Sequence, residues 1–234
     1  MDAVILAGGK GTRLYPYTVS IPKPLVPLGE VPIIEIVLRQ LVKHGVTRAH
    51  LALGYLAELL MAYFSQVDHR LDLELIYSIE EAPLGTVGPL SKMEDLGETF
   101  LALNGDVLTT LPYSDLVAFH RRSGCIATFA VKNRSVPVNF GVVEISGDGR
   151  IVGHREKPDL HLNVGMGVCV FERDVAGFIP KGVRFDIPDL VHALLEAGES
   201  LAAYVSDDYW MDIGRPEDYA QAQEDFTVGP ERFL

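Results

Sequence analysis

The chain has 234 residues, of which 48% are hydrophobic, and its net charge is −12 at pH 7. This length and apolar content suffice for a sizeable core, and no linker or repeat divides residues 1–234, so we expect a single domain. The negative charge disfavours nucleic acid as a partner. No basic leader precedes the first apolar segment, and no apolar run approaches the roughly 18 residues of a membrane span. We therefore expect a cytoplasmic protein without a membrane partner.

Buried strands alternate with amphipathic helices through the first half of the chain. Ile34, Val37 and Leu38 recur on one helical face, and Gly45 is the kind of residue that ends such a helix. This alternation predicts a three-layer α/β/α fold with a mixed, mostly parallel sheet. Strands are expected at residues 3–6, 49–53, 73–77 and 99–103, and a second helix at residues 56–64.

The second half is richer in strands. Asp148-Gly149 is typical of a hairpin turn between two of them. A helix over residues 187–196 has Asp186 as its expected N-cap and Gly198 after its end, and a last helix begins near Pro216. Strands are expected at residues 126–131, 141–145, 150–155 and 166–171.

The cysteines and histidines form no metal-binding pattern. Cys125 and Cys169 lie in apolar, strand-like contexts without a basic neighbour, so we expect buried and unreactive thiols. No two histidines have a convincing ligand spacing. We expect these residues to be at the surface or incidental to function: His44, His50, His69, His120, His154, His161 and His192.

Residues 6–13 read LAGGKGTR and follow the first predicted strand. The three glycines leave backbone N–H groups free to face an anion, and Arg13 adds a planar fork for phosphate oxygens. A tight strand–helix turn is the alternative, but the flanking cations and a second cationic segment, Pro22-Lys23-Pro24, favour a phosphate loop. The spacing matches neither the Walker loop nor the dinucleotide fingerprint, which argues against kinase, GTPase and NAD-binding functions.

Two aspartates are candidate metal ligands. Asp106 follows the strand predicted at residues 99–103, and Asp212 lies in another apolar segment with polar flanks. A turn aspartate is the alternative for Asp106, because Asn-Gly-Asp is common in turns. A shared Mg²⁺ would suit hard carboxylate oxygens and would offset the charge of a polyanionic substrate. Lys23 lies between two prolines, which predicts a rigid, extended segment that presents its ammonium group.

Further motifs follow these segments in a fixed order. With the glycine loop and the Pro-Lys-Pro segment, they resemble the signature of the sugar-1-phosphate nucleotidyltransferases. The resemblance covers nearly the whole chain, and the ordered set is far more specific than any one member. The motifs are Gly85-Thr86-Val87-Gly88, Asn104-Gly105-Asp106, Glu156-Lys157-Pro158, Asn163-Val164-Gly165 and Trp210-Met211-Asp212-Ile213-Gly214.

The resemblance implies a Rossmann-like (GT-A-like) domain that transfers a nucleotidyl group from an NTP to a sugar 1-phosphate and releases pyrophosphate. It implies Mg²⁺ held by Asp106 and Asp212, and catalytic roles for Arg13, Lys23 and Lys157. The nucleotide would contact Leu6, Ala7, Gly8, Gly9, Gly11, Thr12, Arg13, Glu80, Gly85, Thr86 and Asp106. The sugar phosphate would contact Asn104, Gly141, Glu156, Lys157 and Asn163.

Glu80 favours guanine, because a carboxylate can accept from both the N1–H and the 2-amino group. GTP is therefore the expected donor, and the resemblance implies a mannose- or heptose-type sugar 1-phosphate as acceptor, because guanylyl donors in this family usually pair with mannose-type acceptors. Three alternatives stay open: a uridylyl- or thymidylyltransferase, a transferase acting on a non-sugar phosphate, and a non-catalytic homologue that regulates a partner. The chain stops eight residues after Phe226, so we expect no C-terminal β-helix domain, and a homodimer is compatible with the sequence.

Overall fold

The computed structural model describes residues 1–67 and 71–234. Its centre is a seven-stranded sheet in the order β12-β8-β11-β6-β1-β4-β5. The pairs β1–β4, β1–β6, β4–β5 and β8–β12 are parallel, whereas β11 runs antiparallel to both of its neighbours. The strands are β1 (Asp2–Ala7), β4 (Arg48–Leu53), β5 (Glu74–Ile79), β6 (Thr99–Asn104), β8 (Ala127–Pro137), β11 (Asp159–Glu172) and β12 (Leu201–Val205).

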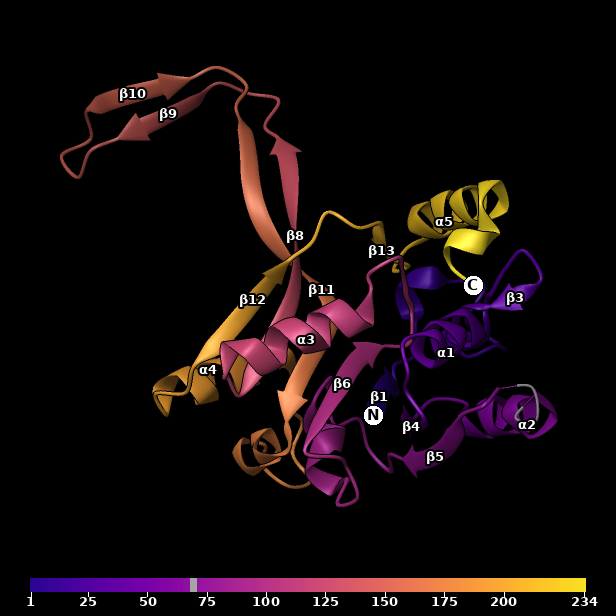
Figure 1. Ribbon diagram of the computed structural model, residues 1–234. Coiled ribbons are helices and arrows are strands. Elements are labelled where there is room, and N and C mark those ends of the chain that lie inside the picture. Colours follow the sequence, from indigo (N-terminus) through magenta and orange to yellow (C-terminus); the bar gives the residue numbers. More distant parts are fainter. Residues whose placement is uncertain (68–70) are drawn as a thin grey trace.

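The sheet is covered on both faces, as Figure 1 shows. Strand β1 alternates its side chains between two apolar clusters: Ile5 packs with one and Val4 with the other. The first cluster contains residues of α1 (Ile33–Lys43), α2 (Ala57–Val67) and α3 (Tyr113–Ser123). The second contains residues of α4 (Ile187–Glu196) and of the two 3₁₀ helices η4 (Gly88–Lys92) and η5 (Arg173–Phe178). The predicted three-layer α/β/α fold with a mixed, mostly parallel sheet is therefore confirmed.

A third apolar cluster joins the two ends of the chain. Phe226 of α5 (Pro216–Val228) packs there with Leu14, Leu28 and Ile213. Two small antiparallel pairs lie beside the main sheet, and one of them carries residues of the site described below. They are β2 (Pro27–Leu28) with β3 (Val31–Pro32), and β7 (Val107–Thr109) with β13 (Trp210–Asp212).

Most predicted elements of the first half are confirmed within one or two residues, although α2 runs on to Val67. Helix α1 ends at Lys43, and Gly45 follows with a φ of +81°. The N-cap of α4 is Asp186, whose N–H donates to Oδ2 of Asp189 at 2.9 Å. The sequence reasoning missed α3 and β12, and it expected an extended Lys23 where residues 23–25 form a 3₁₀ turn.

The largest difference from the predicted elements is the length of β8 and β11. Both strands continue well past the sheet and pair with each other from Asp159↔Pro137 to Gly165↔Val131. Beyond them, β9 (Val142–Ile145) and β10 (Ile151–Arg155) form a further hairpin. We call residues 132–165 the arm, and Figure 1 shows it projecting from the body of the molecule.

Two histidine predictions and one cysteine prediction are wrong. His120 is 1% exposed and sits between Thr128 and Glu172, with Nδ1 2.8 Å from Oγ1 and Nε2 3.0 Å from Oε1. His50 is also buried, whereas His69 lies outside the described residues. Cys125 lies in the loop before β8 rather than in a strand and is half-buried.

Cys169 is buried in β11, as predicted, and burial raises its pKa to about 12. A thiol that stays protonated is a poor nucleophile. Among the described residues, no helix combines the length and the apolar character that a membrane span requires.

Candidate active site

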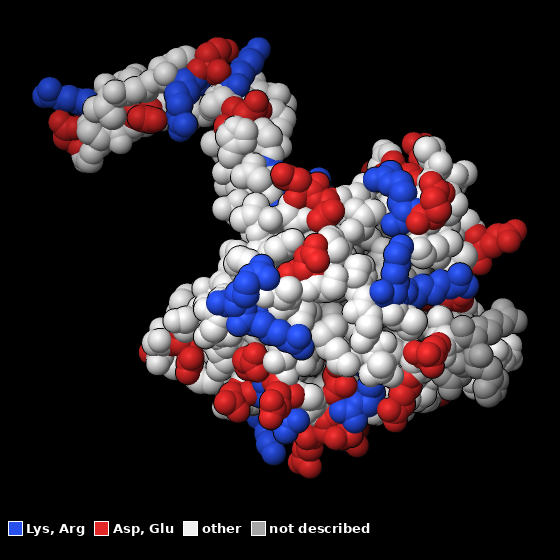
Figure 2. Space-filling view, in the orientation of Figure 1, with Lys and Arg blue, Asp and Glu red and all other residues white. Residues whose placement is uncertain are grey.

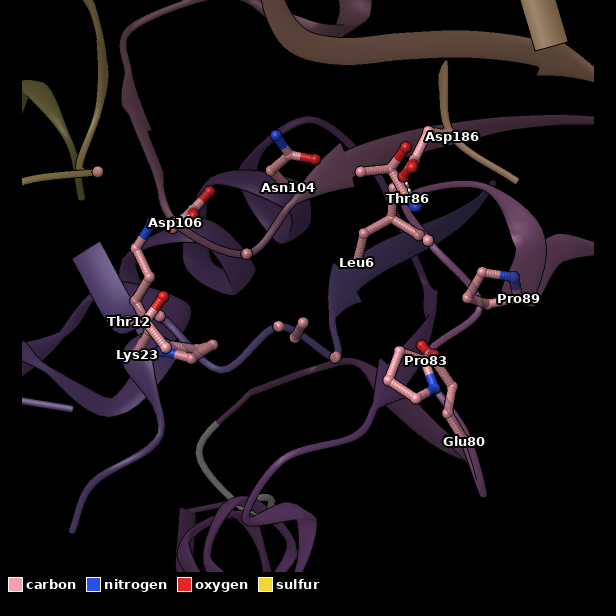
Figure 3. Close-up of a pocket in the computed structure, with 18 of the residues that line it drawn as sticks. Leu6, Thr12, Lys23, Glu80, Pro83, Thr86, Pro89, Asn104, Asp106 and Asp186 are labelled. Carbon is pink, nitrogen blue, oxygen red and sulfur yellow. Dashed lines mark hydrogen bonds and ion pairs between the residues drawn. The ribbon is translucent and has the colours of Figure 1, made fainter. Parts of the chain in front are cut away.

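A cavity of about 440 Å³ opens at the carboxyl edge of β1 and β6. These two strands are parallel neighbours, so their last residues and the loops after them lie side by side. Figure 3 shows the labelled lining from Lys23 and Asp106 at one end to Pro83 and Pro89 at the other. The lining comprises Leu6, Ala7, Gly8, Gly9, Gly11, Thr12, Arg13, Lys23, Pro24, Glu80, Pro83, Gly85, Thr86, Pro89, Asn104, Gly105, Asp106, Arg184, Asp186, Asp212 and Gly214.

Two of the three glycines in the loop have no room for a side chain. A Cβ on Gly8 would stand 2.6 Å from Oε1 of Glu80. Gly11 has a φ of +61°, and a Cβ there would meet Lys23 and Thr18 at 3.0 Å. Gly9 has open space around it, so close packing does not explain that glycine. The loop therefore lies along the cavity with its backbone exposed to a ligand.

Asp106 and Asp212 meet because two short strands pair. Val107 of β7 lies opposite Asp212 of β13, and the backbone N–H of Ile213 donates to the carbonyl oxygen of Asp106 at 3.2 Å. These residues are about a hundred positions apart in the chain, so only this ladder brings the two carboxylates to one end of the cavity.

The two carboxylates suit a divalent cation. Oδ1 of Asp106 is buried and has no hydrogen-bond partner among the described residues. Burial, and after it the charge of Asp106, raises the pKa of Asp212, so a bound cation would relieve an unfavourable pair of charges. The two carboxylates thus have the chemistry of a divalent-cation site.

Lys23 lines the same end of the cavity. Its side chain is 9% exposed, and Nζ forms an ion pair with Oδ2 of Asp106 (Figure 3). A buried lysine without such a partner would be strongly unfavourable. Arg13 also lines this end, and its positive charge acts on Asp212. This end of the cavity therefore contains two cations and two carboxylates.

The other end of the cavity has a different chemistry. Glu80 follows β5, and Oε2 of its carboxylate accepts from the backbone N–H of Leu84 at 2.9 Å. Burial raises the pKa of Glu80, and the hydrogen bond from Leu84 opposes that shift. Pro83 and Pro89 stand near it in Figure 3 and offer flat apolar surfaces of the kind that stack against a ring.

A segment that the sequence reasoning missed holds the loop over residues 84–88 in place. The carbonyl oxygen of Phe185 accepts from the N–H groups of Val87 and Gly88 at 3.1 and 3.0 Å. Oδ1 of Asp186 accepts from the N–H of Thr86 at 2.8 Å. We call residues 184–187 the strap. The local pattern marks Asp186 only as an N-cap, because the partners of the strap lie about a hundred residues earlier in the chain.

The strap also leaves no room for a side chain at Gly85. Its φ is +82°, and a Cβ would stand 2.6 Å from the carbonyl oxygen of Phe185 and 2.8 Å from Oδ1 of Asp186. Because the strap already occupies the N–H groups of Thr86, Val87 and Gly88, these groups are not free for a ligand, whereas the Glu80 carboxylate lines this end of the cavity.

The predicted sugar-side residues divide into two groups. Asn104 lines the cavity, and Gly167 lets its amide pack closely, since a Cβ there would stand 2.7 Å from Nδ2. The other four lie on the arm and do not line the cavity: Gly141, Glu156, Lys157 and Asn163. The structure brings together the predicted nucleotide residues and leaves most of the predicted acceptor residues apart from them.

Relatives of known name match nearly all of this chain. A UTP–glucose-1-phosphate uridylyltransferase from Synechocystis is 34% identical over 95% of the chain. A mannose-1-phosphate guanylyltransferase catalytic subunit beta from Dictyostelium discoideum is 35% identical over 94% of it. The chain spans 62% of the length of each of these relatives.

Solved structures share the architecture. The crystal structure of HddC from Yersinia pseudotuberculosis complexed with GMP-PN superposes with a TM-score of 0.72 at 26% identity, over 96% of this chain and 99% of that one. A putative glucose-1-phosphate thymidylyltransferase from Bacillus anthracis, at 21% identity, shares the fold with a TM-score of 0.75, over 96% of this chain and 94% of that one. The sequence profile of the family described as "Nucleotidyl transferase" matches residues 2–228, and the chain belongs to that family.

Proposed function

We propose that this protein transfers a guanylyl group from GTP to a mannose- or heptose-type sugar 1-phosphate, with Mg²⁺ bound by Asp106 and Asp212. The observation that carries the proposal is the two-ended cavity. Cations and carboxylates lie at one end, and Glu80 lies with the prolines at the other. A nucleoside triphosphate has the same division, with a ring at one end and a charged chain at the other.

The reaction needs no covalent enzyme intermediate. An oxygen of the sugar phosphate attacks the α-phosphorus of the NTP, the bond to the bridging oxygen breaks, and pyrophosphate leaves with that electron pair. Catalysis is then positioning and charge neutralisation. Arg13 and the glycine loop would hold the leaving phosphates, while Lys23 would hold Asp106 in place. When bound, Mg²⁺ would supply positive charge at the α-phosphate.

GTP is favoured over UTP by Glu80, whose acceptor oxygens match the two donors on the edge of guanine. The names of the relatives support both readings: a guanylyltransferase and a uridylyltransferase are similarly close to this chain. UTP with glucose 1-phosphate is accordingly the second candidate. We place the protein in the cytoplasm, where both kinds of substrate are found.

Pyrophosphate release tests the proposal. Wild-type protein with Mg²⁺ is assayed with each of five NTPs against mannose, heptose, glucose and galactose 1-phosphates. We expect the highest kcat/KM for GTP with a manno-configured acceptor, and no release when the acceptor is omitted. Leading activity with UTP and glucose 1-phosphate would replace the substrates but keep the reaction. No release with any pair would overturn the proposed reaction.

A further inference from the structure

Beyond its base, the arm does not pack against the body of its own chain. No residue from 131 to 165 is buried. Strands β9 and β10 pair with each other alone, and a two-stranded sheet is marginally stable by itself in water. A projecting structure of this kind gains stability when another surface covers it.

The arm is also unusually apolar for an exposed segment. Val143, Ile145 and Ile151 share one face of the β9–β10 hairpin, because Ile145 pairs with Ile151 and side chains alternate along a strand. Their exposed fractions are 43%, 67% and 73%. Eight of the 18 exposed large apolar side chains of the described residues lie on the arm. They are Val136, Phe140, Val143, Ile145, Ile151, Val152, Leu160 and Leu162. Contiguous apolar surface of this kind marks an interface.

The charge of the arm differs from that of the body. Residues 132–165 contain five Lys or Arg and four Asp or Glu, a net charge of +1, which leaves −13 for the rest of the chain. Figure 2 shows charges of both signs spread along the arm, with large uncharged areas between them. Electrostatics therefore favour contact of the arm with an acidic body such as that of this chain.

The base of the arm is fixed in its outward direction. Nζ of Lys132 donates to the carbonyl oxygen of Asp207 at 3.0 Å, and the guanidinium group of Arg134 lies 5.7 Å from the centre of the Trp210 ring. On the body side, β8 and β11 pair again within the main sheet from Cys169↔Phe129, after an irregularity between Gly165 and Cys169. Folding the arm back over its own cavity would break these contacts.

The cavity lacks free positive charge for a second phosphate. Of its three cations, Lys23 is paired with Asp106 and Arg184 with Asp186, which leaves Arg13 beside Asp212. Lys157, on the arm, is an exposed cation. Each chain thus has a cavity that needs an acceptor-binding group and an arm that carries one elsewhere.

We propose that two copies of this chain exchange arms. The arm of one protomer lies across the cavity of the other, where its Lys157 meets the phosphate of the acceptor and its Glu156 meets hydroxyl groups. A two-fold dimer makes the exchange reciprocal, so each of the two sites is built from both chains. This inference rests on the proposed function for the chemistry of the acceptor, but its prediction of a dimer does not.

A mixed dimer tests whether the site is shared. Asp106→Asn damages the cavity and Lys157→Ala damages the arm, and the two variants are co-expressed with different tags so that the mixed dimer can be isolated. At subsaturating acceptor, each variant alone should be nearly inactive. The mixed dimer contains one site with an intact cavity and an intact arm, so it should recover about half of the wild-type turnover. Turnover no higher than that of the parents would mean that the arm serves its own cavity, and the exchange would be wrong.

A mass measurement tests the interface without any assay of activity. Light scattering should give the mass of a dimer for wild type and for the control Val228→Asp, whose exposed side chain lies off the arm. The double variant Ile145→Asp with Ile151→Asp should give a folded monomer, since these side chains contact little within one chain, and its melting temperature should no longer rise with protein concentration. A wild-type monomer at micromolar concentration would overturn the proposal. A dimer without pyrophosphate release would overturn the proposed reaction instead.

Discussion

The cavity and the arm differ in how far the rest of the chain buries them. The cavity lies at the carboxyl edge of a sheet that is covered on both faces, and its Lys23–Asp106 ion pair is largely buried. The arm carries four of the five predicted acceptor residues, and none of its residues is buried. Substitutions in the cavity should therefore affect folding, donor binding and chemistry together, whereas substitutions on the arm should affect acceptor use and dimer assembly.

The largest expected effect is at the carboxylate pair. Asp212→Asn should lower turnover about 10³-fold, because it removes charge at the reacting phosphate. Its melting temperature should hold or rise, since burial and the charge of Asp106 already raise the pKa of this carboxyl group. Steady-state kinetics and calorimetry measure both effects. Asp207→Asn, an exposed aspartate in the segment before β13, is the control.

Asp106→Asn should lose the same activity but, unlike Asp212→Asn, it should also lose stability. It leaves the ammonium group of Lys23 buried without its partner, at a cost of up to about 3 kcal/mol. Equal melting temperatures for the two variants would mean that the Lys23–Asp106 pair contributes nothing to folding.

The second prediction concerns the arm. Lys157→Ala should raise the KM for the sugar 1-phosphate by about 10²-fold, because one charge-assisted contact with phosphate is worth roughly 1.5–3 kcal/mol. The Kd of GTP, measured by titration calorimetry, should not change, since Lys157 does not line the cavity. Lys181→Ala, an exposed lysine off the arm, is the control. Equal losses in donor and acceptor binding would remove the distinction between the two regions.

The third prediction separates backbone strain from contact with the strap. Gly85→Ala and Gly182→Ala both place a side chain at positive φ, at +82° and +71°. A Cβ at residue 182 meets nothing within 4 Å, so its cost should be about 1 kcal/mol. At residue 85 the Cβ also meets the strap, and we expect about 2–4 kcal/mol in total together with weaker GTP binding. Chemical denaturation gives both values, and similar costs would mean that the strap yields freely.

The smallest prediction concerns the base. Glu80→Gln should lower kcat/KM for GTP about tenfold relative to UTP, because an amide replaces one acceptor oxygen with a donor. Glu81→Gln, its exposed neighbour, should leave the ranking of donors unchanged. An unchanged ranking in Glu80→Gln would mean that another group reads the base.

The same variant has a pH signature. Since the folded pKa of Glu80 is raised above its ordinary value of 4.5, the folded state holds this proton more tightly than the unfolded chain. Its favourable contribution is complete below that value and is lost as the pH rises through the folded pKa. Glu80→Gln should therefore match wild type in stability near pH 4 and exceed it slightly at pH 7.

Local sequence patterns predicted much of the fold of this protein. The apolar alternation predicted the layers of the sheet, because each buried strand or helix face needs a covering partner. The glycine loop was predicted to line a ligand site, and it lines the cavity, because its glycines and cations lie within eight residues of one another. Asp186 was identified as the N-cap of α4 for the same reason, because a cap bonds within its own first turn.

Only the tertiary structure decided what depends on distant pairing. Asp186 also fixes Thr86, and Asp106 meets Asp212. Both contacts join positions about a hundred residues apart. The direction of the arm depends on how far β8 and β11 stay paired, and a two-residue repeat cannot tell a strand in the sheet from one that leaves it. Sequence therefore marked candidate residues for chemistry, while long-range backbone pairing decided which of them lie together.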